Sequence, residues 1–264
     1  MDALTEKYER LCGILRDCGS AAVAFSGGVD STLLLAAARE ALGETCMAVT
    51  VRSAFFPAKE AEAAEELCRM LGAESIVLDA DVLAVPGVAE NPPERCYLCK
   101  RAILGMIKDA ASARGLACVV EGSNLDDRND YRPGARAVRE LGVRSPLREA
   151  ELTKAEIREL SRRLGLPTAE KPAMACLASR VPTWEALTEE KLRRVEAAEA
   201  YLAALGLTQR RVRVHGDLAR IETLPEEAAR VTERAAEVDA ALKKIGFRYV
   251  ALDLGGYRMG NMNR

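Results

Sequence analysis

The sequence is poor in several features that mark whole classes of protein. It contains one histidine, His215, which excludes a zinc site built on two histidines. It has no excess of positive charge, because 38 Lys and Arg residues face 40 Asp and Glu residues, and nucleic-acid-binding domains usually carry a basic surplus. It has no apolar run of membrane-spanning length and no signal-peptide pattern. We therefore expect a cytoplasmic protein that binds neither nucleic acid nor membrane.

Cysteine is the residue type that is unexpectedly common, with eight copies in 264 residues. Their spacing indicates no disulfide framework. Five fall within expected helices or strands and are interpreted as small buried hydrophobes: Cys12, Cys18, Cys46, Cys68 and Cys118. Cys96, Cys99 and Cys176 remain as candidates for chemistry.

The order of expected elements predicts an α/β fold. Helices are expected at 4–18, 32–42, 58–71 and 96–114, and strands at 21–25, 45–51, 75–78 and 118–120. Such alternation is typical of a parallel sheet with helices on both faces. Ligands of such sheets bind beyond the carboxyl ends of the strands, where residues 26–31 and 121–124 lie. We expect this domain to span residues 1–170.

The C-terminal part of the chain has a different order of elements. A helix at 189–205 is expected first, then strands at 211–214 and 219–222, a helix at 225–245 and a strand at 249–252. This order predicts a small α+β domain over residues 185–264. Residues 171–184 contain Pro172 and Pro182 and show little periodicity, so we expect them to form a linker that carries Cys176.

The segment Ser26-Gly27-Gly28-Val29-Asp30-Ser31 lies between an expected strand and an expected helix. Two glycines let backbone N–H groups approach an anion, and the start of the helix adds its positive dipole end. Asp30 suits a Mg²⁺ ion that accompanies a phosphate. The alternative is a Gly-Gly turn in which Asp30 or Ser31 caps the helix. The whole hexapeptide in this setting favours phosphate binding.

Cys96-Tyr97-Leu98-Cys99 forms a C-x-x-C at the start of an expected helix. A helix N-terminus and neighbouring cations favour thiolates. A second C-x-x-C, which structural zinc usually requires, is absent. With Cys176 the pair makes three thiolates, enough for an iron–sulfur cluster with one open iron. A redox pair, or three unrelated cysteines with Cys176 in the core, are the alternatives that spacing leaves open.

Seven segments carry a resemblance to a known family. They occur in one order at 26–31, 95–100, 121–127 (Glu-Gly-Ser-Asn-Leu-Asp-Asp), 130–134 (Asp-Tyr-Arg-Pro-Gly), 144–147, 166–168 and 175–180 (Ala-Cys-Leu-Ala-Ser-Arg). The first resembles the PP-loop of the N-type ATP pyrophosphatases. The whole set, which extends over nearly the entire chain, resembles the LarE family of ATP-dependent sulfur transferases in nickel-pincer nucleotide biosynthesis.

The resemblance implies a PP-loop ATPase fold and a reaction. ATP and Mg²⁺ would adenylate pyridinium-3,5-biscarboxylic acid mononucleotide, with Ser26, Gly27, Gly28, Asp30 and Ser31 at the phosphates, and sulfur would then displace AMP. Some members sacrifice the sulfur of one cysteine, at the position of Cys176. Others hold a [4Fe-4S] cluster on three cysteines, and Cys96, Cys99 and Cys176 match that type. Asp30 and Cys176 would be catalytic. A sulfide donor and a homo-oligomer are expected as partners.

Two weaker signals lie downstream. Arg211 and Arg213 alternate on an expected strand and so share a face. A solvated face is the plain interpretation, whereas the resemblance implies binding of the substrate phosphate. Glu196 and Glu199 share a helical face and either hold a divalent cation or lie in solvent. Residues 181–184, Val-Pro-Thr-Trp, depart from the Ile-Pro-Tyr-Gly common in the family, so contacts there are not transferred.

Three other functions are compatible with parts of the pattern. A tRNA thiolation enzyme shares the PP-loop but usually has a basic surplus or an RNA-binding domain. An amidotransferase-like synthetase would adenylate a carboxylate or carbonyl and add ammonia, without needing three placed cysteines. A regulatory module would bind nucleotide without chemistry, and release of pyrophosphate with the mononucleotide would exclude it.

Overall fold

The computed structural model describes residues 2–128, 133–172 and 175–258. The residues Asp130, Tyr131 and Arg132 of one family segment, and Ala173 and Met174 before Cys176, lie outside that part of the chain. The chain divides into two compact units. Unit 1 consists of residues 1–53, 58–82 and 94–174, and unit 2 of residues 54–57, 83–93 and 175–264. The division at 174/175 lies inside the expected linker, but unit 2 also includes two earlier segments that the sequence did not reveal.

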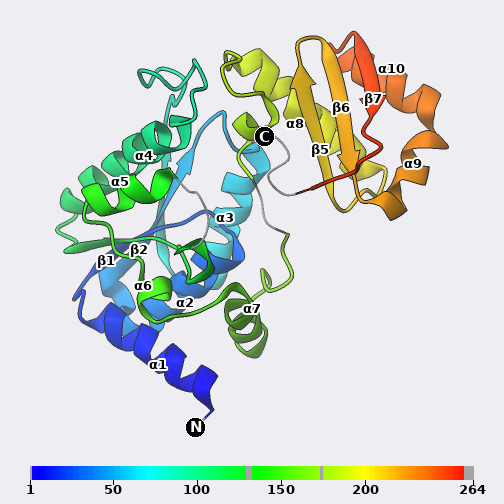
Figure 1. Ribbon diagram of the computed structural model, residues 1–264. Coiled ribbons are helices and arrows are strands. Elements are labelled where there is room, and N and C mark those ends of the chain that lie inside the picture. The colour runs from blue at the N-terminus through cyan, green and yellow to red at the C-terminus, as the bar shows by residue number, and fades with distance from the viewer. Residues whose placement is uncertain (1, 129–132, 173–174, 259–264) are drawn as a thin grey trace. The chain divides into compact units, whose positions relative to one another are not determined.

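Unit 1 is built on a four-stranded parallel sheet, which confirms the predicted fold class (Figure 1). Its strands are β1 (Ala21–Ala24), β2 (Cys46–Arg52), β3 (Glu74–Asp79) and β4 (Cys118–Val120), in the order β3-β2-β1-β4. Strands β1, β2 and β3 follow one another in one direction and β4 lies on the other side of β1, so the strand order reverses between β1 and β4. Ligand sites of open parallel sheets form at such a point, beyond the carboxyl ends of the strands.

Four helices of unit 1 follow the predicted pattern: α1 (Ala3–Arg16), α2 (Val29–Leu42), α3 (Ala58–Met70) and α4 (Arg95–Ser112). Three more were not predicted: α5 (Gly134–Glu140), α6 (Pro146–Glu149) and α7 (Lys154–Arg163). The start of α7 is fixed by a capping box, in which Thr153 and Glu156 exchange side-chain to backbone hydrogen bonds. The spacing Thr-x-x-Glu is a readable signal for this start.

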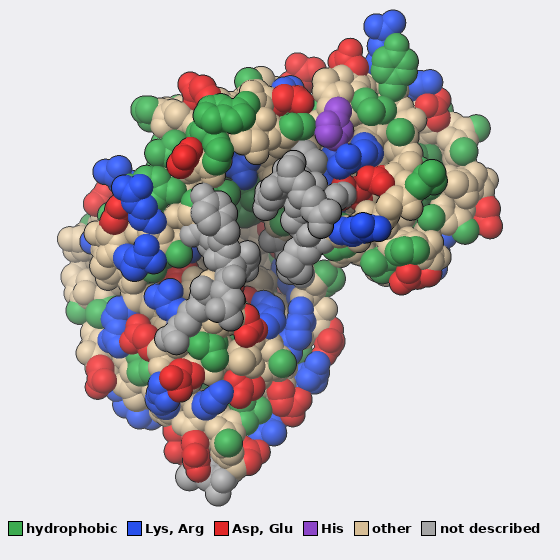
Figure 2. Space-filling model, in the orientation of Figure 1, with side chains coloured by type: hydrophobic (Ala, Val, Ile, Leu, Met, Phe, Trp, Pro, Cys, Tyr) green, Lys and Arg blue, Asp and Glu red, His purple; other side chains and the backbone are tan. Residues whose placement is uncertain are grey.

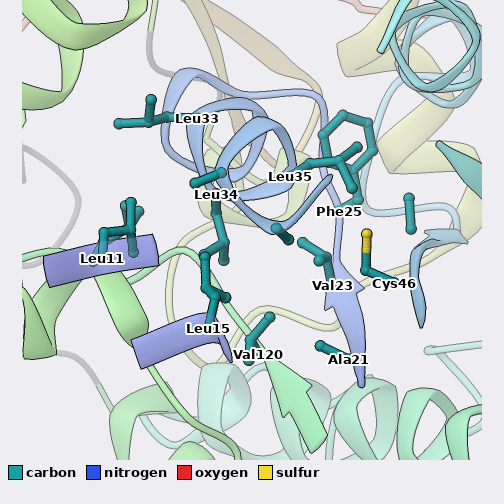
Figure 3. Packing of buried hydrophobic residues seen from close by; sticks show 14 of the residues in the cluster. Leu11, Leu15, Ala21, Val23, Phe25, Leu33, Leu34, Leu35, Cys46 and Val120 are labelled. Carbon is teal, nitrogen blue, oxygen red and sulfur yellow. The ribbon is translucent and has the colours of Figure 1, made fainter. Parts of the chain in front are cut away.

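The two faces of the sheet carry two separate hydrophobic cores. Ala21 and Val23 of β1 point into the core that α1, α2 and α3 cover, whereas Ala22 points into the core beneath α4 and α5. Figure 3 shows the first core, with Leu33, Leu34 and Leu35 of α2 above β1. Side chains of successive strand residues alternate between faces, so a strand of small apolar residues can serve both cores. Helices on both faces of the sheet are therefore confirmed.

The structural cysteines lie largely where the sequence predicted. Cys12, Cys18, Cys46 and Cys68 are buried, and Cys118 is half-buried. Burial raises the pKa of the Cys12 and Cys68 thiols to about 11. Such thiols stay protonated and act as small apolar groups in the core.

Unit 2 contains a three-stranded sheet of mixed direction. Its strands are β5 (Arg210–His215), β6 (Leu218–Thr223) and β7 (Tyr249–Leu252), and its longer helices are α8 (Glu189–Ala204) and α10 (Ala235–Ile245). Strands β5 and β6 are antiparallel, and β6 and β7 are parallel. Buried residues of α8 and α10, such as Val195 and Leu242, form its core together with Val212 and Ile221.

The single helix predicted at 225–245 is wrong. The segment forms a short 3-10 helix (Pro225–Glu227), then α9 (Ala228–Thr232) and, after a break, α10. The hydroxyl of Thr232 donates to the carbonyl oxygen of Ala229 at 3.1 Å, and Arg234 leaves helical geometry with φ −114° and ψ 27°. Thr side chains that bond back to the preceding turn compete with helix continuation. None of the described helices is long and apolar enough to cross a membrane.

The two early segments of unit 2 are bound to its later residues by specific contacts. The carbonyl oxygen of Phe55, a residue only 1% exposed, accepts a hydrogen bond from Leu177 N at 2.8 Å. The side chain of Asn91 is buried and donates to the carbonyl oxygen of Pro182 at 2.7 Å. Residues far apart in the sequence therefore complete one small domain.

Candidate functional site

The hexapeptide 26–31 follows β1 and leads directly into α2, as predicted. Gly27 has φ +65°, a backbone conformation that favours glycine. Gly28 is the N-cap of α2, and no side chain caps that end. Ser31 Oγ instead donates to the carbonyl oxygen of Gly28 at 3.1 Å and lies 3.3 Å from Ser26 N. The alternative of a turn capped by Asp30 or Ser31 is thus wrong, and the N-terminus of α2 is left open to an anion.

Asp30 has two partners that sequence reasoning did not find. Its Oδ1 accepts a hydrogen bond from Asn124 Nδ2 at 3.2 Å, and its Oδ2 is ion-paired with Lys154 Nζ. Asn124 follows β4, and Lys154 is the first residue of α7. The loop therefore has a lysine beside its carboxylate in addition to its backbone N–H groups. A Mg²⁺ ion bound by Asp30 would displace Lys154 from the carboxylate.

Glu121, at the end of β4, is almost wholly buried beside the loop. It accepts hydrogen bonds from Lys100 Nζ at 2.9 Å and from Ser145 Oγ at 2.6 Å. Burial raises the pKa of this carboxyl, but the positive charge of Lys100 and the hydrogen bonds outweigh it, so its pKa lies below the ordinary value. A β-carbon added at the neighbouring Gly122 would come within 3.2 Å of Ser31 N, so the end of β4 closely approaches the loop.

Cys96 and Cys99 lie in the first turn of α4, one exposed and one half-buried. Residues three apart share a helical face, so both thiols are on one side of α4. Arg95 Nη2 lies 3.4 Å from Cys96 Sγ. Both cysteines belong to unit 1.

Cys176 belongs to unit 2, where it is the N-cap of a short 3-10 helix (Leu177–Arg180). Its thiol is half-buried. The guanidinium of Arg180 holds this segment by donating to the carbonyl oxygens of Ala175 at 2.8 Å and Cys176 at 2.9 Å. Within residues 2–128, 133–172 and 175–258, no group of three His, Cys, Asp or Glu side chains is assembled for a metal ion.

The buried Arg180 also contacts Glu199, and this contact bears on one predicted metal site. Arg180 forms two hydrogen bonds of 2.8 and 2.9 Å to the carboxylate of Glu199, which also accepts Val212 N at 3.0 Å. The oxygens of Glu199 are thus already used by an arginine and a backbone amide. This geometry does not support Glu196 and Glu199 as ligands of a divalent cation, and it assigns Glu199 to positioning Arg180.

The predicted pair Arg211 and Arg213 proves unequal. Arg213 is 5% exposed, donates twice to Glu222 at 3.0 and 2.8 Å, and donates to the carbonyl oxygen of Ser179 at 3.0 Å. A solvated face is therefore wrong for Arg213, because its charge is neutralised inside unit 2. Glu222 is wholly buried and is also paired with Arg220 at 3.0 Å.

Arg211 is half-buried, and its guanidinium lies over the ring of Tyr257, 5.3 Å from the centroid. Burial lowers the pKa of Arg211, and the nearby charge of Arg180 lowers it further, against an opposing effect of Glu199. Burial is the larger cause, so the lowered pKa mainly reflects the enclosure of this guanidinium, and Arg180 places a second positive charge nearby. Of the predicted pair, Arg211 is the better placed for a phosphate.

The charged surface gives no sign of a nucleic-acid interface on the face seen in Figure 2. Lys and Arg side chains are interspersed there with Asp and Glu side chains. This distribution agrees with the formal net charge of −2. Interspersed charges do not produce the extended positive potential with which proteins attract RNA.

Comparisons with known proteins extend these observations. The family model described as "Queuosine biosynthesis protein QueC" matches residues 20–89. An uncharacterized protein of Synechocystis sp. is 41% identical over 99% of this chain and 98% of its own length. Pyridinium-3,5-bisthiocarboxylic acid mononucleotide synthase of Lactiplantibacillus plantarum is 40% identical over 100% of this chain and 96% of its own length. The glutamine-hydrolyzing GMP synthase of Aeropyrum pernix is 31% identical over 68% of this chain but 38% of its own length.

Proposed function

The chain belongs to the LarE family of ATP-dependent sulfur transferases, and from that premise we propose that it converts pyridinium-3,5-biscarboxylic acid mononucleotide into the thiocarboxylate ligand of a nickel-pincer cofactor. The observation that carries this proposal is the 40% identity to the synthase of L. plantarum along both chains. The match to GMP synthase covers 38% of that protein and supports only the use of ATP.

The first step is adenylation at the loop 26–31. A substrate carboxylate oxygen attacks the α-phosphorus of ATP, the bond from that phosphorus to the oxygen of the β-phosphate breaks, and pyrophosphate leaves. The backbone N–H groups at the start of α2 bind the departing pyrophosphate, and Ser26 and Ser31 add hydroxyl donors. Asp30 would hold a Mg²⁺ ion that accompanies the phosphates, and Lys154, which is paired with Asp30, can neutralise phosphate charge.

The second step forms the carbon–sulfur bond. Sulfide attacks the carbonyl carbon of the acyl adenylate, and AMP leaves with the electron pair of the broken carbon–oxygen bond. We assign Arg211 to the phosphate of the mononucleotide, because its guanidinium is half-buried near the second positive charge of Arg180, whereas Arg213 is paired with Glu222. Arg213 has a structural role, because it forms an ion pair with the buried Glu222.

The residues present fit a [4Fe-4S] cluster as the source of sulfide. Cys96 is exposed, Cys99 and Cys176 are half-buried, and Arg95 Nη2 lies 3.4 Å from Cys96 Sγ. Cys176 has its backbone held by Arg180, as suits a ligand from a separate segment. The chemistry that a three-cysteine cluster supplies, when bound, is a transferable sulfide. A sacrificial Cys176 would need neither Cys96 nor Cys99.

The test is an anaerobic reaction with ATP, Mg²⁺, added sulfide and the mononucleotide, after reconstitution with iron and sulfide. We expect AMP, pyrophosphate, more than one product sulfur per chain and an unchanged mass of Cys176. Replacing Cys96, Cys99 or Cys176 by Ala should remove both iron and sulfur transfer. Cys118→Ala, a change at a half-buried cysteine outside the set, should retain both.

Each part of the proposal can fail separately. Loss of 34 Da from Cys176 in proportion to product, or full activity without iron, would show the sacrificial route and overturn the cluster. Turnover of ATP to ADP and phosphate would overturn the pyrophosphatase step. Sulfur transfer to tRNA, with no product from the mononucleotide, would overturn the substrate.

A further inference from the structure

Lys171 contacts the phosphate-binding loop from a segment that follows α7. Its Nζ donates to the carbonyl oxygen of Gly27 at 3.0 Å and to Glu60 Oε2 at 2.8 Å. All three residues belong to unit 1. Lys171 is the first residue of the expected linker 171–184, and the mechanism above gives it no role.

The peptide unit that Lys171 contacts is the one most able to rotate. It joins Gly27 to Gly28, and two adjacent glycines restrict φ and ψ less than any other pair. Because a trans peptide is planar, its C=O and N–H point in opposite directions. A hydrogen bond that holds the carbonyl of Gly27 therefore fixes the direction of the Gly28 N–H. Within the described residues this N–H has no acceptor.

The side chain of Lys171 is itself held in place. Arg158 donates to the carbonyl oxygen of Lys171 at 3.0 Å and also to that of Ala169, which ties the backbone to α7. Glu60, near the start of α3, neutralises the ammonium charge. A lysine paired in this way contributes little net charge to the loop. What it contributes is a fixed donor on one carbonyl.

We propose that Lys171 is a positioning residue for the ATP pyrophosphatase step, which locks the Gly27–Gly28 peptide with its N–H directed at the pyrophosphate part of ATP. The proposal rests on the proposed function in placing ATP at this loop. An ammonium on the carbonyl also polarises the peptide, so the opposite N–H becomes a stronger donor. Without the lock, the peptide samples both orientations, and part of the ATP binding energy is used to select one.

The test compares Lys171→Met with Lys7→Met. Lys7 forms an ion pair of the same kind with Glu156, at 2.7 Å and with side chains 29% and 30% exposed, against 23% and 24% for Lys171 and Glu60. Binding of AMP and of an ATP analogue with a methylene bridge between the α and β phosphorus atoms is measured by calorimetry. Lys171→Met should weaken binding of the analogue roughly ten- to a hundredfold and binding of AMP less than threefold. Lys7→Met should change neither.

The salt dependence of binding distinguishes a lysine that fixes the Gly27–Gly28 peptide, called here a lock, from a lysine that simply attracts phosphate by its charge. An attraction between Lys171 and phosphate would be screened, so the ratio of wild-type to Lys171→Met affinity would shrink from 50 to 500 mM salt. A lock predicts a constant ratio. Lys171→Gln retains a neutral donor and should recover part of the affinity, and it replaces Lys171→Met if that variant does not fold.

The outcomes distinguish this inference from the proposed function. Suppose that the wild-type protein binds the analogue and forms AMP and pyrophosphate. If Lys171→Met then binds the analogue as tightly as the wild type, or weakens AMP binding as much as analogue binding, the positioning role of Lys171 is refuted and the proposed function is not. A ratio that falls with salt also refutes it. If the wild-type protein forms no AMP from ATP and the mononucleotide, the proposed function itself fails.

Discussion

Removing Arg213 should destabilise unit 2 far more than removing a surface arginine. Glu222 is 0% exposed and receives two hydrogen bonds from Arg213 and one ion pair of 3.0 Å from Arg220. Loss of one partner of a buried pair costs about 3–5 kcal/mol, because a charge is left without compensation. Since Arg220 remains beside Glu222, we expect Arg213→Met to cost about 3 kcal/mol.

Hydrogen exchange measures the loss of stability separately in unit 1 and in unit 2. The opening free energy of amides in β5 and β6 should fall by that amount in Arg213→Met, while amides of β1 and β2 remain unchanged. Arg52→Met, which removes an exposed pair with Asp79, should leave the amides of β2 almost unaffected. Arg213→Met combined with Glu222→Met should recover much of the loss, since an apolar pair of similar volume needs no partner. The reasoning would be refuted if Arg213→Met lowered the opening free energy no more than Arg52→Met does. It would also be refuted if the double variant were as unstable as Arg213→Met.

Three further predictions follow from the site. Asp30→Ala should abolish Mg²⁺-dependent release of AMP and pyrophosphate while thermal unfolding stays cooperative, and near-normal release would contradict a metal role. Arg211→Met should weaken binding of the mononucleotide roughly ten- to a hundredfold, as measured by calorimetry, and leave ATP binding intact. Equal weakening of the binding of both ligands would contradict the assignment. Glu121 has a folded-state pKa below its ordinary value of 4.5, so its stabilisation is present above about that pH and is lost as the pH falls further. Below pH 4.5, the unfolding free energy of Glu121→Gln should therefore vary less with pH than that of the wild type. Urea unfolding at several pH values measures both, and an equal dependence on pH in the two proteins would exclude this contribution.

The fold of unit 1 could be predicted because its signals are local. Short apolar strands, glycine-containing turns and helices with apolar spacing alternate from residue 21 to residue 120, and each signal lies within its own element. Helices α5 and α6 were missed because segments of seven and four residues are too short to show periodicity. The break before α10 was missed because it depends on one threonine hydroxyl rather than on Gly or Pro.

The loop residues of the site could be predicted, but their partners could not. Asn124 and Lys154 are 94 and 124 positions away from Asp30, and no local pattern connects them. Arg213 was expected to share one environment with Arg211, because strand alternation places both on one face. Burial by Ser179 and Glu222 depends on tertiary packing, which separates the two arginines.

The discontinuous unit 2 has a consequence for synthesis on the ribosome. Residues 54–57 and 83–93 are made long before residues 175–264, with which they share one domain. At roughly 5–20 residues per second, the segment that ends at residue 93 waits on the order of ten seconds for residue 175. During that time Phe55 and Asn91 lack the partners that bury them. Unit 1 is therefore expected to fold first on the nascent chain, while residues 54–57 and 83–93 still lack their partners. A chain cut at residue 174 would never supply those partners.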